Sequence, residues 1–277
     1  MTASIAPYAE TQTAQEVLVK FLDWVGGYEV FGGGSILEIG CGAGHSTEQI
    51  LKRMSFDSLL AIEPDPRYLQ EAQNRLRVEV QANRVNFWQG QAQGLCDYLD
   101  EHHYFTPEWF IWANGIHYLQ DREELADFFR TMNFHYIDGF FCTSFWQGSV
   151  DRRAFSVLGK MNRFALEHLG LNPKGEDVPS ARRLHEWSLG AYEELARAAG
   201  YDRVDILQVP MQLPVDVYTG IAHDETWVNN ALPPEKALAQ FSQEERIEAL
   251  VVGAQRAYLE AGVETTTRIW AFVHVAL

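Results

Sequence analysis

The residues best suited to chemistry in this sequence form a glycine-rich bend, Glu38-Ile39-Gly40-Cys41-Gly42-Ala43-Gly44. Glycines between a strand and a helix let the backbone approach a bound ligand closely, and the helix N-terminus presents free N–H groups to the negative part of that ligand. The spacing is GxGxG, and His45 stands where a dinucleotide-binding fingerprint has its third glycine. The bend therefore predicts a ligand-binding turn.

A second carboxylate closes the next predicted strand. Glu63 lies 19 positions beyond Gly44, which suits a carboxylate that accepts both hydroxyls of a ribose. A glycine turn alone is a weak signal. Together with Glu38 inside the first strand and Glu63 at the end of the second, it predicts a pocket for a ligand that contains a nucleoside.

Apolar periodicity predicts the elements that position these residues. An amphipathic helix over 14–25 comes first, and strands then alternate with helices. Because parallel neighbours need crossover connections, this alternation predicts an α/β fold with a doubly wound, mostly parallel sheet and helices on both faces. The predicted strands are 35–40, 58–65, 84–89, 109–114, 139–146, 204–210 and the C-terminal run TRIWAFVHV.

Two further helices have the start signal of a capping box, at Asp121–Glu124 and at Ser242–Glu245. The alternation lapses in two stretches, 147–185 and 211–240, which we expect to be irregular. The segment 151–183 carries seven basic and four acidic residues, so it has a charge of +3 inside a strongly acidic chain.

The composition limits the classes of partner. The 277 residues have a formal net charge of −16, which argues against a nucleic-acid partner, because Lys and Arg contacts to phosphate supply most of that affinity. Cys41, Cys96 and Cys142 are too widely spaced to predict a disulfide framework or a metal site. The N-terminus lacks a signal-peptide pattern and no apolar run approaches ~18 residues, so we expect a cytoplasmic protein without a membrane anchor.

From about residue 30 to 277 the sequence resembles the Rossmann-like (class I) S-adenosylmethionine-dependent methyltransferases of the small-molecule type. LEIGCGAGHST resembles their cofactor loop, AIEPD the strand end that binds ribose, GQAQGL the adenine loop, and WANGIHYLQD the segment beside the transferred methyl group. The resemblance implies seven strands, with the last (268–275) inserted antiparallel. It also implies an N-terminal cap helix over 1–30 and a methyltransferase domain over 31–277, with a lid inserted at about 147–185.

The same resemblance implies S-adenosyl-L-methionine as the cofactor and a role for each matching residue. The glycines would pass under its methionine part, Glu38 would orient the turn, Glu63 beside Pro64 would hold the ribose, and the main chain of Asn114 would contact the ammonium group. Gln91 and Ala92 stand at the adenine loop, where related enzymes usually have an acidic residue before a backbone N–H. An amide oxygen must then accept from the adenine amino group. The implied cofactor residues are Glu38, Gly40, Gly42, Gly44, Glu63, Pro64, Gln91, Ala92 and Asn114.

The methyl acceptor is less constrained. A general base is needed for a hydroxyl or carbon acid but not for an ionised carboxylate. His117, three residues past the fourth strand, is the best-placed titratable group; a histidine that only bonds a neighbouring loop is the open alternative. Tyr8, Tyr118 and Trp146 are candidates for shaping the acceptor pocket.

Asn-Gly-Ile-His follows the fourth strand in place of the Asn/Asp-Pro-Pro-Tyr/Phe expected for methylation of base amines or amide nitrogens. We hypothesise that the basic stretch closes over a small acceptor with negative charge, such as a carboxylate-bearing or peptide-derived metabolite. The arginines assigned to it are Arg152, Arg153, Arg163 and Arg182.

Three interpretations stay open: a small-molecule methyltransferase, which we favour; an S-adenosylmethionine-binding enzyme of non-methyl-transfer chemistry such as cyclisation; and a nicotinamide-dependent oxidoreductase. The GxGxG spacing and Glu38 disfavour the third. The sequence leaves the oligomeric state open.

Overall fold

The computed structural model describes residues 7–277 except 29–32, 103, 104, 114, 117, 118, 120, 146–151, 177 and 179–187. It divides into two compact units. The sheet unit comprises Val17–Phe145, His185–Val209 and Trp270–Leu277, and the helical unit comprises Met1–Glu16, Trp146–Leu184 and Pro210–Ile269. The predicted domain boundary after residue 30 and the predicted lid stay predictions.

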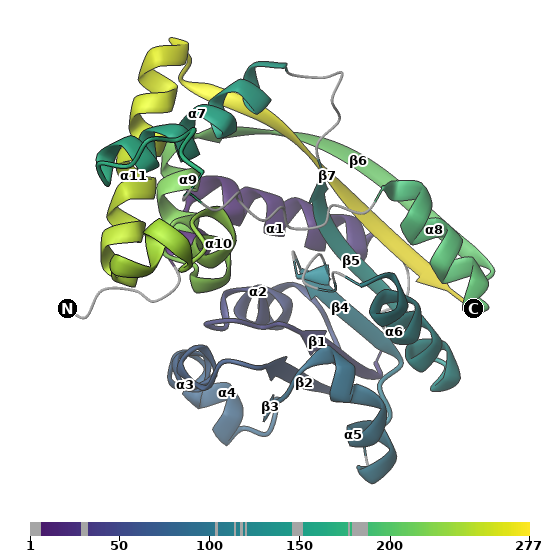
Figure 1. Ribbon diagram of the computed structural model, residues 1–277. Coiled ribbons are helices and arrows are strands. Elements are labelled where there is room, and N and C mark those ends of the chain that lie inside the picture. Colours follow the sequence, from purple (N-terminus) through teal and green to yellow (C-terminus); the bar gives the residue numbers. More distant parts are fainter. Residues whose placement is uncertain are drawn as a thin grey trace. The chain divides into compact units, whose positions relative to one another are not determined.

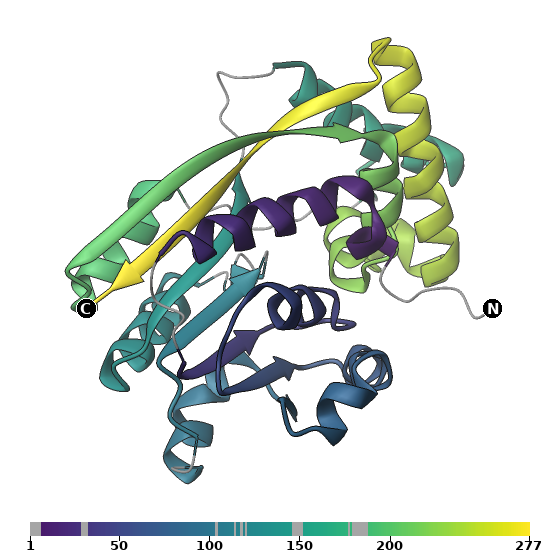
Figure 2. The same ribbon diagram turned by 180° about the vertical axis from the view of Figure 1, so that it is seen from behind.

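Seven strands form one sheet in the order β3-β2-β1-β4-β5-β7-β6. The neighbours among the first five are parallel, while the arrowhead of β7 points against that of β4 in both ribbon views (Figures 1 and 2). The predicted α/β fold with a mixed, mostly parallel seven-stranded sheet is therefore confirmed. The strands are β1 (Ser35–Ile39), β2 (Ser58–Glu63), β3 (Val85–Gln89), β4 (Trp109–Ala113), β5 (Asp138–Phe145), β6 (Arg203–Pro214) and β7 (Thr265–Ala276).

Helices connect these strands. In the sheet unit they are α2 (His45–Arg53), α3 (Pro66–Arg75), α4 (Arg77–Gln81), η2 (Ala92–Gly94), α5 (Leu95–Glu101), α6 (Arg122–Phe134) and α8 (Leu189–Ala198). In the helical unit they are η1 (Pro7–Glu10), α7 (Arg152–His168), α9 (Val215–Ile221), α10 (Glu225–Ala231), η4 (Lys236–Gln240) and α11 (Gln243–Ala261), and α1 (Gln12–Gly26) has residues in both units. Among the described helices none is long and apolar enough to cross a membrane.

Alternation along β5 places helices on both faces of the sheet. Phe140 contacts Trp24 of α1, with ring centroids 5.9 Å apart. The next residue, Phe141, contacts Phe129 of α6 and Tyr192 of α8. Because successive side chains of a strand point to opposite faces, α1 covers one face and α6 and α8 cover the other, as Figures 1 and 2 show.

The stretch expected to be irregular at 147–185 contains the long helix α7, so that prediction was wrong. Its apolar residues Val157, Met161, Phe164 and Ala165 recur at helical spacing and are buried. They pack where α7 meets α11. The two helices lie so close together that a Cβ on Gly253 of α11 would lie 2.4 Å from the carbonyl oxygen of Met161. The basic residues between these apolar positions obscured the pattern in the sequence.

The second stretch expected to be irregular, 211–240, holds the end of β6 and three short helical segments. Each segment has five or seven residues, and a helix of this length is too short to be recognised from the spacing of apolar residues in the sequence.

The two predicted helix starts differ. Ser242 and Glu245 form the predicted capping box of α11. Asp121 caps α6, but its carboxylate accepts the N–H of Glu123, one residue short of the position that a capping box uses.

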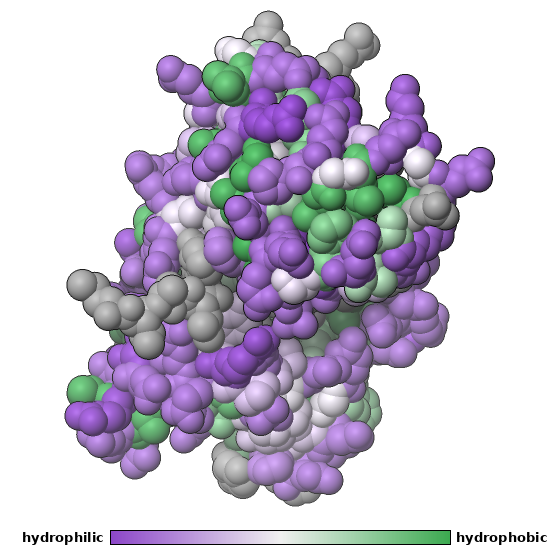
Figure 3. Space-filling model, turned by 60° about the vertical axis from the view of Figure 1, so that its left-hand side comes forward, coloured by the Kyte–Doolittle hydropathy of each residue, from purple (hydrophilic) through white to green (hydrophobic). Residues whose placement is uncertain are grey.

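The exposed large hydrophobic side chains among the described residues are Val78, Phe134, Tyr136, Leu207, Leu259 and Leu277. Hydrophilic residues dominate the face drawn in Figure 3, with a smaller cluster of hydrophobic ones. This surface agrees with the acidic composition of the chain.

Candidate functional site

The glycine turn (residues 40–44) joins β1 to α2 at the carboxyl end of β1. Gly40, Gly42 and Gly44 have φ angles of 68°, 55° and 82°, a region that residues with a Cβ rarely adopt. At Gly44 space is also short, because a Cβ there would lie 3.0 Å from Cα of Ala72 in α3. Gly44 is the N-cap of α2 and offers no side-chain cap, which leaves that helix end suited to a ligand.

Glu63 ties this turn to the end of β2. Its side chain is 7% exposed, and its Oε2 accepts the N–H of Gly42 at 2.9 Å. Its Oε1 accepts the N–H of Asp65 at 3.0 Å. The neighbouring N–H of Cys41 donates to the carbonyl of Ile62 at 2.9 Å. The two loops at the carboxyl ends of β1 and β2 therefore form one hydrogen-bonded unit.

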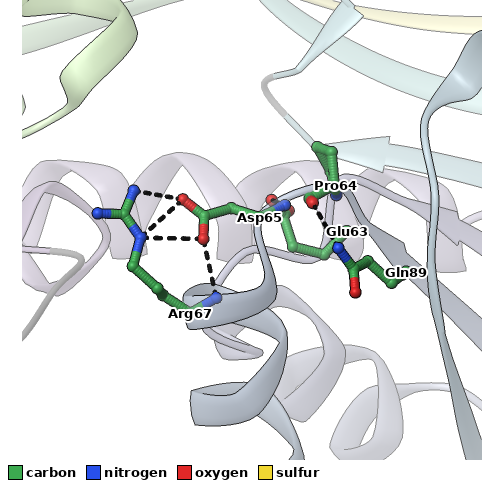
Figure 4. Close-up of polar contacts among 5 residues, drawn as sticks. All are labelled: Glu63, Pro64, Asp65, Arg67 and Gln89. Carbon is green, nitrogen blue, oxygen red and sulfur yellow. Dashed lines mark hydrogen bonds and ion pairs between the residues drawn. The ribbon is translucent and has the colours of Figure 1, made fainter.

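The segment after Glu63 is held in turn by its own contacts. Asp65 caps α3 and pairs with Arg67, and the amide of Gln89 in β3 donates to the carbonyl of Pro64 at 3.5 Å (Figure 4). Pro64 itself is exposed. These bonds fix the place from which the Glu63 carboxylate reaches the glycine turn.

Glu38 lies below the turn in β1 and is 1% exposed. The hydroxyl of Ser46 in α2 donates to its Oε1, whereas Oε2 has no hydrogen-bond partner among the described residues. Burial raises the pKa of Glu38 to about 7; the hydroxyls of Ser46 and Thr47 oppose this shift, and the charge of Glu63 adds to it. The carboxyl group is therefore poised between its two protonation states near neutral pH.

Cys41 is a buried residue of the same turn, 3% exposed. Burial, and then the negative charges of Glu38 and Glu63, raise the pKa of its thiol. Because only the thiolate is a good nucleophile, Cys41 is a packing residue of the turn.

The loop after β3 carries the predicted adenine residues. Gln91 precedes η2 and is exposed, and Ala92 is the first residue of η2. The indole of Trp88 lies over this loop, since a Cβ on Gly90 would meet its ring edge at 2.3 Å. Trp88 also contacts Tyr98, with ring centroids 4.1 Å apart. Sequence reasoning did not single out Trp88, although an aromatic residue two positions before a glycine loop is a readable signal.

Trp112 of β4 borders the glycine turn from the other side. A Cβ on Gly40 would lie 3.3 Å from its Nε1, and one on Gly115 would lie 2.0 Å from it. The ring packs edge-on against Phe128 of α6, with centroids 5.1 Å apart. The strand order reverses between β1 and β4, and ligands of open α/β sheets bind at such a reversal. The sequence analysis did not single out Trp112.

Several predicted site residues lie outside the described residues, and their roles stay predictions: Asn114, His117, Tyr118, Trp146 and Arg182. Arg152 and Arg153 belong to α7, but their side chains are not described.

Two other predicted residues belong to the helical unit. The carbonyl of Tyr8 accepts the N–H and the hydroxyl of Thr11 at 3.0 and 2.8 Å. Arg163 is exposed, and its guanidinium pairs with Glu260 of α11 at 3.2 Å and with Glu167 at 3.6 Å. The positive charge of Arg163 is therefore balanced within this unit, and its role toward an acceptor stays a prediction.

Residues 36–134, which hold the glycine turn, Glu63, Trp88 and Trp112, match the family model described as a methyltransferase domain. No curated protein matches the sequence.

The fold resembles solved structures at low sequence identity. A proposed sarcosine dimethylglycine methyltransferase from Galdieria sulphuraria has a TM-score of 0.54 at 10% identity, covering 95% of this chain and 86% of the other. YcgJ from Bacillus subtilis has a TM-score of 0.53 at 12% identity, covering 95% and 98%. The (4+2)-cyclase SpnF has a TM-score of 0.52 at 13% identity, covering 96% and 82%.

The strand order, the glycine turn at the end of β1 and the family match agree with one another. Residues 36–134 match a methyltransferase domain, and the fold of the chain resembles that of solved methyltransferase structures.

Proposed function

We propose that this protein transfers the methyl group of S-adenosylmethionine to a small-molecule acceptor. The observation that carries the proposal is the bond from the Gly42 N–H to Glu63, beside the buried carboxyl group of Glu38. This bond brings three groups together at the carboxyl ends of neighbouring strands. They are the backbone of the glycine turn, the carboxylate of Glu63 that accepts from it, and the buried carboxyl group of Glu38 in β1.

These residues fit the parts of the proposed cofactor. The buried Oε2 of Glu38 lacks a partner among the described residues, and a cationic ammonium group is the kind of ligand that satisfies such an acceptor. The oxygens of Glu63 accept the N–H groups of Gly42 and Asp65, and a carboxylate has about four lone-pair sites in all, which suits a group that also accepts the hydroxyls of a ribose. The indole face of Trp88 and the amide of Gln91 suit a purine ring.

When bound, S-adenosylmethionine supplies a methyl group already activated on a sulfonium centre. The task of the chain is then to hold the acceptor in line and to exclude water. We assign the glycine turn and the Asn114 carbonyl to the methionine part, Glu63 beside Pro64 to the ribose, and Gln91 with Ala92 to the adenine.

For the acceptor we propose a small metabolite that carries a carboxylate. Support comes from the positive charge of segment 151–183. Because Glu260 and Glu167 already balance Arg163, this part of the proposal depends chiefly on Arg152, Arg153 and Arg182. His117 would take the proton of a hydroxyl acceptor, and Tyr8, Tyr118 and Trp146 would shape the pocket.

Binding calorimetry tests the cofactor part. We expect S-adenosylhomocysteine to bind wild type and Glu123→Gln, a substitution on the exposed surface of α6, with the same affinity, and to bind Glu63→Ala at least tenfold more weakly. NADH is expected not to bind. Binding of NADH in place of S-adenosylhomocysteine would identify a nicotinamide enzyme and contradict the proposal.

A screen of metabolites that measures S-adenosylhomocysteine release tests the reaction. We expect wild type to release S-adenosylhomocysteine with at least one small acceptor, and we expect Glu63→Ala to release it more slowly. An acceptor that is converted without such release would show non-methyl-transfer chemistry such as cyclisation. The fold alone does not decide between the two, because the cyclase SpnF shares it.

A further inference from the structure

The described residues around Glu38 provide no counter-charge. The groups that shift its pKa are the hydroxyls of Ser46 and Thr47 from α2 and the carboxylate of Glu63 from β2, so no cation of the described chain is among them. The nearby thiol of Cys41 is neutral, since its own pKa is raised.

The cation of α3 that reaches the glycine turn is engaged elsewhere. Arg75 donates from Nε to the carbonyl of Ala43 at 3.0 Å. Its terminal nitrogens lie 3.8 Å from Glu48 and 3.6 Å from Glu71. Arg75 is therefore engaged by Ala43, Glu48 and Glu71, and Glu38 is a buried acid with one oxygen that has no partner among the described residues.

A buried carboxylate without a counter-charge is costly, so the group keeps its proton to a higher pH than an exposed glutamate does, and the arrival of a cation favours loss of that proton. S-adenosylmethionine has a sulfonium, an ammonium and a carboxylate, and hence a net charge of +1. S-adenosylhomocysteine has lost the sulfonium charge and is neutral overall. Both ligands carry the ammonium group that the proposed function assigns to Glu38, and only S-adenosylmethionine adds the sulfonium charge, so S-adenosylmethionine favours the ionised form of a nearby acid more strongly.

We propose that Glu38 is a proton-linked selectivity residue, which loses its proton to solvent when the cationic cofactor binds and thereby favours S-adenosylmethionine over its neutral product. This inference rests on the proposed function. It adds that cofactor binding is coupled to proton release, and that the preference for cofactor over product increases as the pH rises through neutrality.

Titration calorimetry at pH 6, 7 and 8 tests this coupling, with each pH measured in two buffers of different ionisation enthalpy. The dependence of the observed heat on buffer gives the number of protons released. With its pKa at about 7 in the free protein, Glu38 should release nearly one proton at pH 6, about half at pH 7 and little at pH 8. The Kd for S-adenosylmethionine should rise about tenfold from pH 8 to pH 6, and S-adenosylhomocysteine should release fewer protons.

Two variants assign the proton. Glu38→Gln should bind S-adenosylmethionine without the proton release seen in wild type and with a Kd that varies less with pH. Glu123→Gln is the matched control, because Glu123 is a glutamate of α6 whose side chain is 76% exposed and pairs with Arg130 on the surface. It should release protons as wild type does.

The outcomes separate the two proposals. If S-adenosylmethionine binds and wild type releases no proton at pH 6, or Glu38→Gln releases as many as wild type, the coupling is refuted while the proposed function stands. Equal release with both ligands refutes the selectivity. If neither ligand binds at any pH, the proposed function fails and the coupling with it.

A direct titration covers the case in which Glu38→Gln does not fold. The carboxyl carbon of Glu38 in carbon-13-labelled wild-type protein should titrate near pH 7 in the free protein and at lower pH with S-adenosylmethionine bound. A midpoint near the ordinary 4.5 in the free protein would overturn the proposal.

Discussion

The Oε2 of Glu63 accepts the N–H of Gly42 at 2.9 Å, so the end of the second strand holds the turn that follows the first. Both residues occupy loops at the carboxyl ends of adjacent parallel strands, in which Ile39 pairs with Ile62. The shape of the turn therefore depends on a residue 21 positions away in the sequence.

Removing this acceptor should weaken the turn and, with it, the contact to a ribose that we propose for Glu63. We expect Glu63→Ala to lower cofactor affinity more than Glu63→Gln, because the amide keeps an oxygen acceptor but loses the charge. A hydrogen bond to a charged group contributes about 1.5–3 kcal/mol, so the loss for Glu63→Ala should be roughly ten- to a hundredfold in Kd. Calorimetry measures it, and wild-type affinity in Glu63→Ala would contradict the assignment.

The glycines of the turn should differ in their tolerance of a methyl group. Gly42→Ala meets nothing within 4 Å and has only the positive φ to overcome, so it should cost about 1–2 kcal/mol of unfolding free energy. Gly44→Ala also approaches Ala72 at 3.0 Å and should cost about 2–4 kcal/mol. Urea unfolding of the two variants checks this order, and equal costs would argue against the tight contact with α3.

The contact between Trp112 and Gly115 should control the cofactor site from the β4 side. Gly115→Ala would place Cβ 2.0 Å from the indole Nε1, so the ring or the loop must shift beside Gly40. We expect cofactor Kd to rise about tenfold, because overpacking typically costs about 1–3 kcal/mol.

Adding Trp112→Phe to Gly115→Ala should recover part of this affinity, since the smaller ring leaves room for the methyl group. Gly159→Ala is the control: it lies in α7 with nothing within 4 Å and should leave cofactor binding unchanged. An affinity of Gly115→Ala equal to that of wild type would show that the indole does not constrain the site.

Glu38 should make the protein less stable as the pH rises. Its folded-state pKa of about 7 lies above its ordinary value of 4.5. The protonated side chain therefore stabilises the folded state fully below pH 4.5, and this stabilisation is lost as the pH rises through 7. The shift in pKa corresponds to at most about 3 kcal/mol of unfolding free energy. Urea unfolding at pH 5 and pH 8 should show a smaller change in Glu38→Gln than in wild type.

His274 should make the protein more stable as the pH rises, the opposite of Glu38. It is buried in β7, and its Nδ1 is bonded to Asp205 at 3.3 Å. Burial lowers the pKa of His274 below the ordinary 6.5, and the charge of Arg203 lowers it further, whereas Asp205 and Asp138 raise it. Below pH 6.5 the unfolded chain takes up this proton more readily than the folded one, so stability falls with acid. His274→Gln should lose less stability than wild type between pH 7.5 and pH 5.5, while the exposed His223→Gln should behave as wild type.

The local pattern was enough to predict the site's framework. Glu38, the glycine turn and Glu63 follow from short-range signals: buried strands that end in an acid, and glycines where a Cβ is not tolerated. The alternation of strands and helices predicted the α/β fold for the same reason. By contrast, α7 was missed although Val157, Met161, Phe164 and Ala165 recur at helical spacing, because basic residues stand between them; that this apolar side packs on α11, some ninety residues further along the chain, is a tertiary feature.

The sequence by itself determined which residues form the turn and which acids flank it, because glycine geometry and strand periodicity are local properties. Only the tertiary structure decided what these residues do to one another. It buried Glu38 with one oxygen that has no partner in the described part of the chain, brought Glu63 to the Gly42 N–H, and set Trp112 against Gly40 and Gly115. Burial, and contacts between neighbouring strands, arise when the sheet assembles, and no local pattern encodes them.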